Sequence, residues 1–500
     1  MSREEKIKNI ALAAVIIIAA VMGIMNGSYL IAAMYIATVV GAAFIIKEKD
    51  LYNSLYAVLL VSAIYDYVLY VPGMQSVYMF HIVLGVFTLI SLYKVFTERE
   101  VFLKLDKKIL GIYVIWFAYM CISIIWAISR SLAIKYIAIY MMMFAFIGCL
   151  MAYNINKERL NESIKLLLYL ISIVVVIGLI EVLLGKQLPV KHYIDGFRDT
   201  LSQLHINIIE ARPIVFSYNT NNLNAQLAIL IPICLFTIYK FESVWVKVWF
   251  SLVSVIAFAL IVITTSRTGY VAFLFGTAVF ILYSIINIKQ LGIKQMIYPA
   301  IIIAGMTLSF FYAPNMMNIK PVEGEKDVEH TITLTGKLNS LQGMIEGEET
   351  SEYSSLNRMA IISDVLKGVI SEKQLQGFGV GNVEQYIKDQ GNTGSIYSPH
   401  CYPIEILGDF GIPGVALFGI YYLYLLIYNF ILSIKKKSAI CSAMVAALIA
   451  FAPASFGPSS ITYVFAYWII VGLAVSCIQV YKDDNSNYRR TSDIKEYKLS

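Results

Sequence analysis

Apolar runs long enough to cross a lipid bilayer recur along this 500-residue chain, and they constrain its fold more than any other feature. A helix that spans the hydrocarbon core needs about 20 mostly apolar residues. The sequence is 59% hydrophobic and 14% charged, whereas soluble domains carry about 25% charged residues. Lipid must therefore cover part of the surface. We expect an all-α polytopic membrane protein rather than several soluble domains.

The apolar runs predict about 12 to 14 transmembrane helices, because the tight pairs near the N-terminus can be divided in more than one way. The first run follows a charged N-terminus and has no small-residue cleavage site, so we interpret it as a retained helix and not as a signal peptide. The predicted spans cover residues 10–25, 29–46, 51–70, 77–95, 109–128, 135–153, 164–184, 222–239, 247–264, 269–287, 297–313, 411–434, 438–455 and 459–478.

Lysine and arginine divide the loops between these runs into two sets. Basic residues gather at both ends of the chain and in alternate loops, as in Lys94 to Lys108 and Lys435 to Lys437. The intervening short loops at 26–28, 71–76 and 453–458 contain none, and the exceptions on that side are Arg130 with Lys135, and Arg267. The positive-inside rule then puts both termini in the cytoplasm. We expect a multi-pass protein of a bacterial cytoplasmic (inner) membrane, with a polar cytoplasmic tail at 481–500 that is disordered from Asp483 onward.

This orientation leaves two long segments outside, at about 185–221 and 314–410. The second is a large extracytoplasmic loop in which we expect short helices. It divides the chain into N-terminal transmembrane helices (1–209), a central region (210–435) that includes the loop, and C-terminal transmembrane helices (436–480). No CxxC or Cys/His spacing indicates a metal site, and nothing indicates nucleic-acid binding.

The large loop contains two ordered patterns. From Ser355 to Ile370, apolar residues recur with a helical period after a serine that suits an N-cap, which predicts an amphipathic helix with Arg358 in its first turn. Gly377-Phe-Gly-Val-Gly-Asn382 follows. Its alternating glycines, Gly377, Gly379 and Gly381, permit tight turns and close backbone approach to a ligand, although a simple turn explains them equally and the spacing is not that of a dinucleotide fingerprint.

One histidine and two more arginines stand out on the outer side. His400 precedes the predicted span at 411–434, and an imidazole accepts a proton near neutral pH, so His400 is the candidate general base. Glu405 and Asp409, four residues apart, are placed to share a helix face. Arg212 and Arg267 lie at membrane boundaries, where arginine is costly and often binds phosphate. The alternative reading is a structural histidine and arginines that snorkel to the interface.

Taken together, these residues resemble the signatures of the O-antigen ligase and polymerase superfamily. Arg212-x-x-x-Phe with Asn219 and Asn222 is similar to its first signature, and Ser266-Arg267-Thr-Gly269 to its second. The string from His400 to Gly414 resembles its last signature almost position by position. The chain departs from the family in having Cys401 where asparagine is common and Asp409 where glutamate is common. Thr or Asn also stands where proline usually precedes the second asparagine.

The resemblance implies a membrane glycosyltransferase that transfers or polymerises glycan repeat units from an undecaprenyl-pyrophosphate carrier onto a glycan or lipid-linked acceptor. His400 would be the base, and Arg212, Arg267 and Arg358 would bind the pyrophosphate. No cofactor and no metal are expected. Polysaccharide export or chain-length proteins are possible partners. Seven residues would shape the pocket: Asn219, Asn222, Gly377, Gly379, Gly381, Asn382 and Asp409.

Two other classes of protein fit the same topology. A transporter or flippase of lipid-linked glycans also needs a basic cavity, but its polar groups belong near the bilayer midplane, whereas those of this chain gather at the outer face. A non-catalytic membrane subunit would tolerate replacement of His400 and the arginines. The Lys-, Ile-, Asn- and Tyr-rich composition hints at a Gram-positive host and so favours a capsule, exopolysaccharide or teichuronic-acid-like polymerase over an O-antigen ligase.

Overall fold

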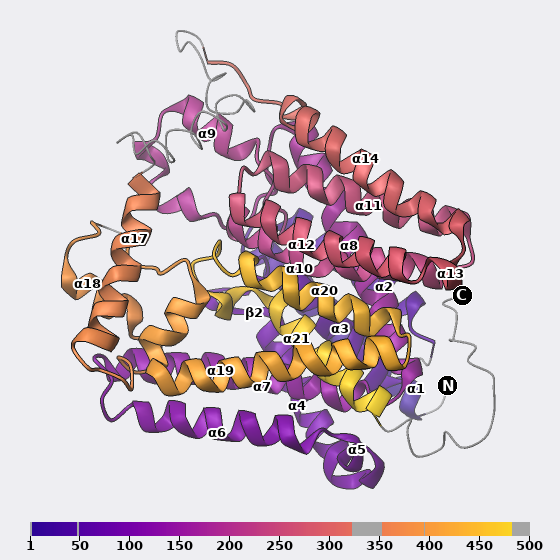
Figure 1. Ribbon diagram of the computed structural model, residues 1–500, viewed down its shortest axis with the longest axis horizontal. Coiled ribbons are helices and arrows are strands. Elements are labelled where there is room, and N and C mark those ends of the chain that lie inside the picture. The colour runs from indigo at the N-terminus through magenta and orange to yellow at the C-terminus, as the bar shows by residue number, and fades with distance from the viewer. Residues whose placement is uncertain (1–2, 48–49, 323–352, 395, 483–500) are drawn as a thin grey trace.

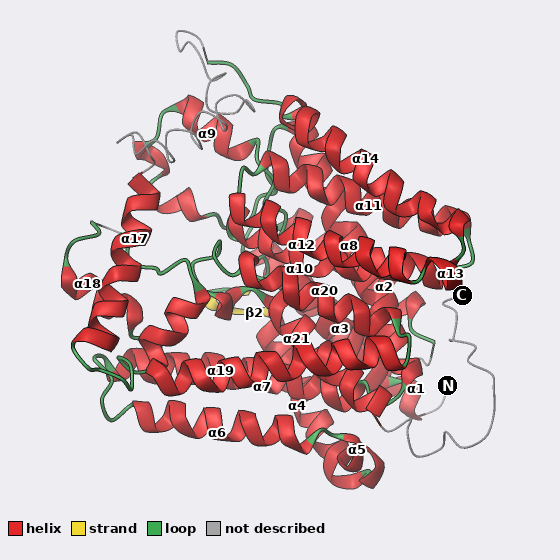
Figure 2. Ribbon diagram, viewed as in Figure 1, coloured by secondary structure: helices red, strands yellow, loops and turns green. Residues whose placement is uncertain are grey.

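The protein is a bundle of antiparallel helices, as the apolar runs predict. The computed structural model describes residues 3–47, 50–322, 353–394 and 396–482. The only strands within these ranges form one short hairpin, β1 (Tyr70–Val71) with β2 (Met74–Tyr78), and Figure 2 shows helices filling almost the whole molecule. Because backbone groups find no water in a bilayer, helices satisfy them within each span.

All fourteen predicted spans are helical. Ten of the described helices are long and apolar enough to cross a bilayer, three shorter apolar helices (α2, α3 and α20) add to them, and α6 completes the set. The fourteen are α1 (Arg3–Met25), α2 (Tyr29–Ile45), α3 (Leu51–Ile64), α4 (Met79–Thr97), α6 (Lys107–Ser123), α7 (Arg130–Tyr153), α8 (Lys157–Leu184), α10 (Thr220–Thr237), α11 (Val244–Ile263), α12 (Arg267–Ile286), α14 (Ile297–Tyr312), α19 (Tyr402–Lys435), α20 (Ala439–Ala454) and α21 (Phe465–Lys482).

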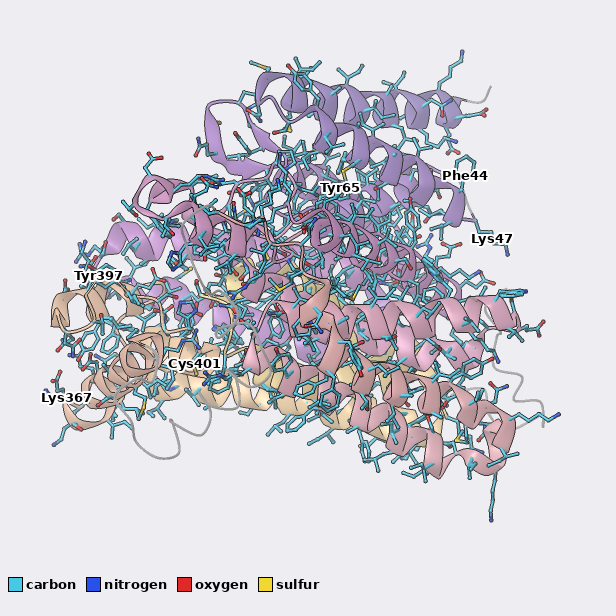
Figure 3. All side chains as sticks on the ribbon, turned by 90° about the horizontal axis from the view of Figure 1, so that it is seen from above. Phe44, Lys47, Tyr65, Lys367, Tyr397 and Cys401 are labelled. Carbon is cyan, nitrogen blue, oxygen red and sulfur yellow. The ribbon has the colours of Figure 1, made fainter. Side chains whose placement is uncertain are left out.

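The short elements gather at the two ends of the bundle. α9 (Gln203–Glu210), α17 (Tyr353–Leu366) and α18 (Val383–Gln390) lie at one end, and α5 (Arg99–Lys104) and α13 (Ile288–Leu291) lie at the other (Figure 1). Figure 3 shows the same polarity, with Lys367, Tyr397 and Cys401 at one end and Phe44 and Lys47 at the opposite one. The loops predicted to be outside thus share one end, which we call the outer end.

The centre of the bundle is α10. Nearly all of α10 and α21 is buried, whereas α1 and α19 expose most of their apolar side chains as lipid-facing helices do. α10 packs against α12 and α20, which also pack against each other. Three polar side chains, Asn222, Asn224 and Gln226, are buried in the first turns of α10. Buried polar groups near a span's end are costly and mark functional regions.

Several element boundaries differ from the sequence prediction, and two of them bear on the candidate residues or the outer loops. The predicted span 51–70 ends as a helix at Ile64, and the chain then turns at Asp66, which has a positive φ of 46°, into the β1–β2 hairpin. The amphipathic helix begins at Tyr353, before Ser355, so that serine is not its N-cap and Arg358 lies in its second turn. Local sequence defines helix existence better than helix ends. The cytoplasmic tail from 483 onward and loop residues 323–352 lie outside the described residues.

α17 buries one face and exposes the other. Ile361, Val365 and Val369 form a small separate core with Phe378 and Tyr386, whose rings stack with centroids 3.8 Å apart. Met359 and Ile370 on the opposite face are exposed. The predicted helix is confirmed, but the face that packs α17 onto α18 and the start of α19 is that of Ile361 and Val365. Of the apolar stripe that the helical period predicts, Met359, Leu366 and Ile370 are exposed.

α19 is broken at Gly411, where φ is 61° and ψ is −158°. The glycine-rich turn fills the break: Phe378 N–H donates to the Gly408 carbonyl at 2.7 Å, and Ile412 N–H donates to the Leu375 carbonyl at 2.9 Å. The turn thus replaces the helical hydrogen bonds that the break removes. Residues 402–410 form a short helix at the outer end, and the predicted span begins at the break.

Replacing Gly411 by alanine should destabilise the protein by about 2 kcal/mol or more, because a side chain at this φ is strained and its Cβ would collide with the Leu375 carbonyl. We expect a lower midpoint of thermal unfolding for the detergent-purified variant, followed by tryptophan fluorescence. Gly419→Ala, in the same helix with open space beside it, is the matched control. Equal midpoints for Gly411→Ala and wild type would contradict this account of the break.

Candidate functional site

His400 lies in a segment without regular secondary structure that is hydrogen-bonded to the loop between α20 and α21. Three bonds alternate along the two segments. Ser398 Oγ donates to the Ser459 carbonyl at 2.7 Å, His400 Nδ1 lies 3.0 Å from the Gly457 carbonyl, and Tyr402 N–H donates to the Ser455 carbonyl at 3.1 Å. We call residues 398–402 and 455–459 the histidine strap. Its spacing of two residues is that of antiparallel chains.

The strap determines the tautomer of His400. A carbonyl oxygen only accepts hydrogen bonds, so the Nδ1 atom must carry the proton that it shares with Gly457. In the neutral ring the lone pair then lies on Nε2. The backbone of His400 has a φ of +47°, a left-handed conformation that few non-glycine residues adopt. The backbone conformation of His400 and the hydrogen bond of its ring with Gly457 therefore hold the side chain in one orientation.

The pKa of His400 lies below its ordinary value. Burial of the imidazole is the main cause, and the positive charge of Arg358 lowers the pKa further, while the hydrogen bond with Gly457 opposes both. A half-buried imidazole beside a cation is neutral at pH 7 and is able to accept a proton. Arg358 and His400, which lie 42 residues apart in sequence, are thus electrostatic neighbours, as required if they serve one site.

Gly457 connects the strap with the beginnings of α10 and α12. A Cβ on Gly457 would press against the Thr268 hydroxyl and lie beside Asn221. Thr268 follows Arg267, the first residue of α12, and Asn221 lies between the candidate residues Asn219 and Asn222. The three sequence signatures, far apart along the chain, therefore meet around the 455–459 segment at the outer end.

Side-chain caps position both helix starts. Asn219 is the N-cap of α10, where its Oδ1 accepts from Asn222 N–H at 2.9 Å. Ser266 is the N-cap of α12, where its Oγ accepts from Gly269 N–H at 3.4 Å. Gly269 itself packs against Asn224 of α10, and a Cβ at this position would lie tightly against the Asn224 side chain. Asn219, like Ser266, therefore has a local structural role in addition to any contact with substrate.

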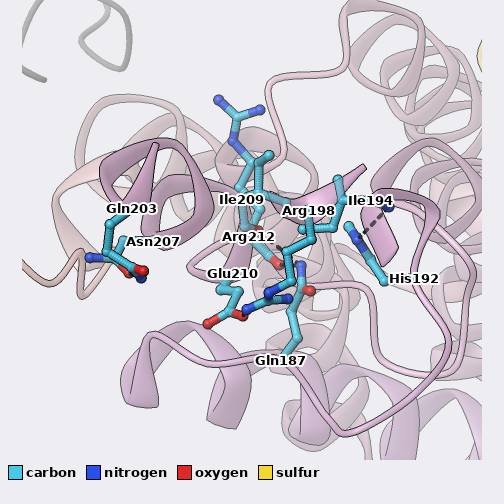
Figure 4. A network of polar contacts seen from close by, with 9 residues as sticks. All are labelled: Gln187, His192, Ile194, Arg198, Gln203, Asn207, Ile209, Glu210 and Arg212. Atoms are coloured by element: carbon cyan, nitrogen blue, oxygen red, sulfur yellow. Dashed lines mark hydrogen bonds and ion pairs between the residues drawn. The ribbon is translucent and has the colours of Figure 1, made fainter. Parts of the chain in front are cut away.

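Arg212 is held in a tightly anchored loop between α9 and α10. The buried carboxylate of Glu181 accepts hydrogen bonds from three backbone amides: Leu188 at 2.7 Å, Ile214 at 2.9 Å and Val215 at 2.8 Å. Val215 has a φ of +55°, which is strained for a β-branched residue. The Arg212 carbonyl accepts from Gln187 Nε2 at 2.8 Å, and Figure 4 shows Gln187 and Arg212 beside the Arg198–Glu210 ion pair.

The guanidinium of Arg212 is half-buried and directed toward α12. Its electrostatic neighbours are the hydroxyls of Tyr193 and Tyr270, and Tyr270 lies one turn after Arg267. Burial lowers the pKa of Arg212, although a guanidinium stays charged in proteins. Among the residues that the structure describes, none accepts a hydrogen bond from Arg212 Nε. A buried donor of this kind is suited to an anion.

The glycine turn faces the protein itself. Gly377, Gly379 and Gly381 all have positive φ, and a Cβ at these positions would collide with the backbone of α19, with Ala127 and with the ring of Tyr136, respectively. Their contacts are those of a packed turn, whereas pocket-shaping by these glycines and by Asn382 stays a prediction. Buried Asn382 accepts from Ser129 N–H at 2.6 Å and donates to the Val380 carbonyl at 2.9 Å.

Asp409 clamps this turn onto the short outer helix of α19. Its two carboxylate oxygens accept from Gly381 N–H at 2.8 Å and Val383 N–H at 2.9 Å. Glu405, four residues earlier, is also buried, and Ser460 Oγ donates to it at 2.6 Å. The predicted shared face of Glu405 and Asp409 is confirmed. Both contacts hold the helix that follows His400 and so position the histidine indirectly.

Sequence reasoning missed Glu181 and the 455–459 segment. An acidic residue inside a spanning run is itself a signal, because it is too costly to stay without partners, but the partner amides are not visible in the sequence. The only signal that the sequence gives for the 453–458 loop is its lack of basic residues. Among the described residues, no cluster of three or more His, Cys, Asp or Glu side chains is placed to hold a metal.

Comparison with known proteins identifies relatives of the chain. Residues 252–419 match the family model described as O-antigen ligase, a range that contains Arg267, Arg358, His400 and Asp409. The teichuronic acid biosynthesis protein TuaE of Bacillus subtilis (strain 168) is 22% identical over 380 residues, which cover 75% of this chain and 72% of TuaE. These findings confirm the resemblance to the O-antigen ligase and polymerase superfamily and indicate a multi-pass membrane enzyme of cell-surface polysaccharide assembly.

Replacing Glu181 by alanine should loosen the Arg212 loop, because three backbone N–H groups lose their acceptor at a cost of about 1–3 kcal/mol each. We expect a lower unfolding midpoint and faster hydrogen exchange in peptides that contain Leu188 and Ile214–Val215. Glu210→Ala, which removes the partly exposed ion pair with Arg198, should change the unfolding midpoint and the exchange rates less. Unchanged exchange in Glu181→Ala would show that the loop is held by other contacts.

Proposed function

Given this relationship, we propose that the chain is a metal-independent glycosyltransferase that transfers or polymerises glycan repeat units carried on undecaprenyl pyrophosphate. It acts at the outer face of the bacterial cytoplasmic membrane, with both termini in the cytoplasm. The histidine strap carries the proposal. It leaves Nε2 of a neutral histidine as the available base and joins it to the starts of α10 and α12.

The reaction requires one proton transfer and one displacement. His400 Nε2 takes the proton of the acceptor hydroxyl as the oxygen attacks the anomeric carbon of the donor sugar. The bond from that carbon to the pyrophosphate oxygen breaks, and its electron pair leaves with the pyrophosphate. The proton ends on the imidazole, and the charge ends on the carrier. The Gly457 carbonyl stabilises the imidazolium because it accepts the hydrogen bond from Nδ1–H throughout the reaction.

The arginines supply the counter-charge for the leaving group. Arg212 is fixed by the Glu181-anchored loop, Arg267 begins α12, and Arg358 lies on α17 near His400. Preorganised cations at the edge of a low-dielectric bundle stabilise developing negative charge more strongly than cations in water do. Arginine also matches two phosphate oxygens at once. The lipid-linked donor brings its own leaving group, so the proposal needs no metal–nucleotide site.

The relative's role in teichuronic acid biosynthesis supports a cell-wall or capsular polysaccharide as product, and hence a polymerase. A ligase that transfers a finished chain to another acceptor is the alternative within the same chemistry. A polymerase uses an acceptor that is itself linked to the carrier, whereas a ligase uses another acceptor. The products of one reaction therefore distinguish a polymerase from a ligase.

Purified protein in nanodiscs, given undecaprenyl-pyrophosphate-linked repeat unit from its host in the presence of a chelator, should form longer glycan. His400→Asn should lower kcat about 10²- to 10⁴-fold, because asparagine tolerates the positive φ but cannot take the proton. Arg267→Ala should lower it about 10²-fold or more. A ladder of products indicates a polymerase and a single addition a ligase.

Two outer-end residues away from the strap serve as matched controls for this assay. His205→Ala changes an exposed histidine of α9 and Arg130→Ala an exposed arginine at the start of α7, and both should keep wild-type rates. Full activity in His400→Asn would refute the assignment of the base. No turnover by folded wild type, with carrier flipping in proteoliposomes instead, would favour a transporter.

The dependence of kcat/KM on pH should report His400. Catalysis needs the neutral imidazole, so the rate is retained above the pKa of His400 and lost as pH falls through it. Because that pKa is lowered, the acid limb should lie below about pH 6.5. Arg358→Gln removes a positive charge that lowers the pKa, so its acid limb should move to higher pH, whereas that of Arg130→Gln should not move. An unmoved limb in Arg358→Gln would contradict the electrostatic coupling.

A further inference from the structure

An apolar crevice of about 630 Å³ opens between α12 and α14. Leu274, Phe275 and Ala278 of α12 and Phe310 and Phe311 of α14 line it, and their side chains are largely exposed. Few polar atoms face the crevice, and the hydroxyl of Thr307 donates to the Ile303 carbonyl of its own helix at 2.9 Å. Such a lining is suited to a hydrocarbon chain that enters from the bilayer.

The crevice exists because α14 packs on only one neighbour. α14 lies against α11 along its length and touches α12 only slightly, and Figure 1 shows these three helices in one corner of the bundle. Gly305 of α14 lets the Val255 side chain of α11 approach closely. α11 therefore forms the back wall, and the gap between α12 and α14 stays open along one side.

The depth of the crevice matches one leaflet. Its α12 lining runs from Tyr270, one turn below the start of the helix, to Ile281, which is a rise of about 16 Å at 1.5 Å per residue. Half of a hydrocarbon core is about 15 Å. In the proposed orientation the crevice spans the outer leaflet and ends near the midplane, so that a lipid of the outer leaflet reaches it directly.

The mouth of the crevice is cationic. Tyr270 lines the crevice at its outer end and is the electrostatic neighbour of the Arg212 guanidinium, and Arg267 lies three residues before it. Tyr270 donates its own hydroxyl to the Val262 carbonyl at 2.9 Å and so fixes the ring between the charged and the apolar regions. A ligand that matches the cationic mouth and the apolar crevice has an anionic head and a long hydrocarbon tail.

We propose that the α12–α14 crevice binds the isoprene units of the donor that lie next to the pyrophosphate. The pyrophosphate then lies at Arg212 and Arg267, and the distal isoprene units lie in the bilayer. This inference rests on the proposed function. A second crevice of about 780 Å³, between α2, α8 and α11, is larger. It lies toward the opposite end, around Lys165 and Trp249, and has no continuity with the histidine strap.

Binding through the crevice makes the length of the lipid a determinant of affinity. Buried hydrocarbon contributes to binding in proportion to its area, so a donor with a chain of two or three isoprene units should have a KM at least about tenfold above that of the undecaprenyl donor. Orientation also follows, because a tail held along α12 places the pyrophosphate and the sugar at the start of α12, where Thr268 lies beside Gly457 of the strap.

The test is photo-crosslinking of the full-length protein in nanodiscs with undecaprenyl pyrophosphate that carries a diazirine in its first isoprene units. We expect label on peptides of α12 and α14, displaced by unlabelled undecaprenyl pyrophosphate. Ala278→Trp fills the crevice and should reduce labelling about tenfold, while Ala416→Trp, the same change on an exposed face of α19, should not. Arg212→Ala should reduce labelling without moving it to other peptides.

Labelling does not depend on turnover, so the two proposals fail separately. Label confined to other helices, or undiminished in Ala278→Trp with the fold shown intact by its unfolding midpoint, would overturn the crevice assignment even if glycan transfer proceeds. Label in α12 and α14 that disappears only in Ala278→Trp and Arg212→Ala would support it even if no transfer is found. In an active protein, equal KM values for short- and long-chain donors would also overturn it.

Discussion

The arrangement of the outer end depends on the break in one membrane helix, α19. At Gly411 the backbone of α19 leaves the helical conformation, and the carbonyl of Gly408 loses its helical partner at the boundary of an apolar phase. The turn at 377–379 supplies the missing donor, and Asp409 binds the amides that follow in the same turn. The short outer helix that carries His400 at its start is positioned by this exchange of hydrogen bonds.

The candidate site combines the two environments that the proposed reaction requires. On one side, α12 and α14 offer an apolar surface to the bilayer, and on the other the strap and α17 offer polar groups to the outer aqueous phase. The arginines lie at the boundary, where a pyrophosphate joined to a hydrocarbon chain is most stable. A reaction between a lipid-linked donor and a hydrated acceptor needs such a boundary, and a soluble fold does not provide one.

Patterns over short stretches of the sequence predicted the helices and the end of the bundle at which the signature residues lie. Hydropathy defined all fourteen spans, the helical period defined α17, and the signature residues Arg267, Arg358 and His400 lie at one end of the bundle as expected. What the sequence did not reveal is the partners: Glu181 with amides 7 to 34 residues away, and His400 with a carbonyl 57 residues later. A backbone acceptor carries no residue-type signal, so no pattern of side chains marks Gly457. The helix ends at Ile64 and Tyr353 escaped prediction for the same reason, because tertiary contacts decide them.

The strained backbone of Val215 lowers the stability of the protein but holds the Arg212 loop in one conformation. A valine at a φ of +55° raises the free energy of the folded state by an amount on the order of 1–3 kcal/mol. The hydrogen bonds that backbone N–H groups donate to the Glu181 carboxylate offset this cost. A glycine at this position would relax the strain and yield a more stable protein, but it would give Arg212, three residues earlier, more conformational freedom in the absence of substrate. In the proposed mechanism such a variant would bind the pyrophosphate with a larger entropic penalty and react more slowly, so substitutions meant to stabilise the protein should leave this strained loop unchanged.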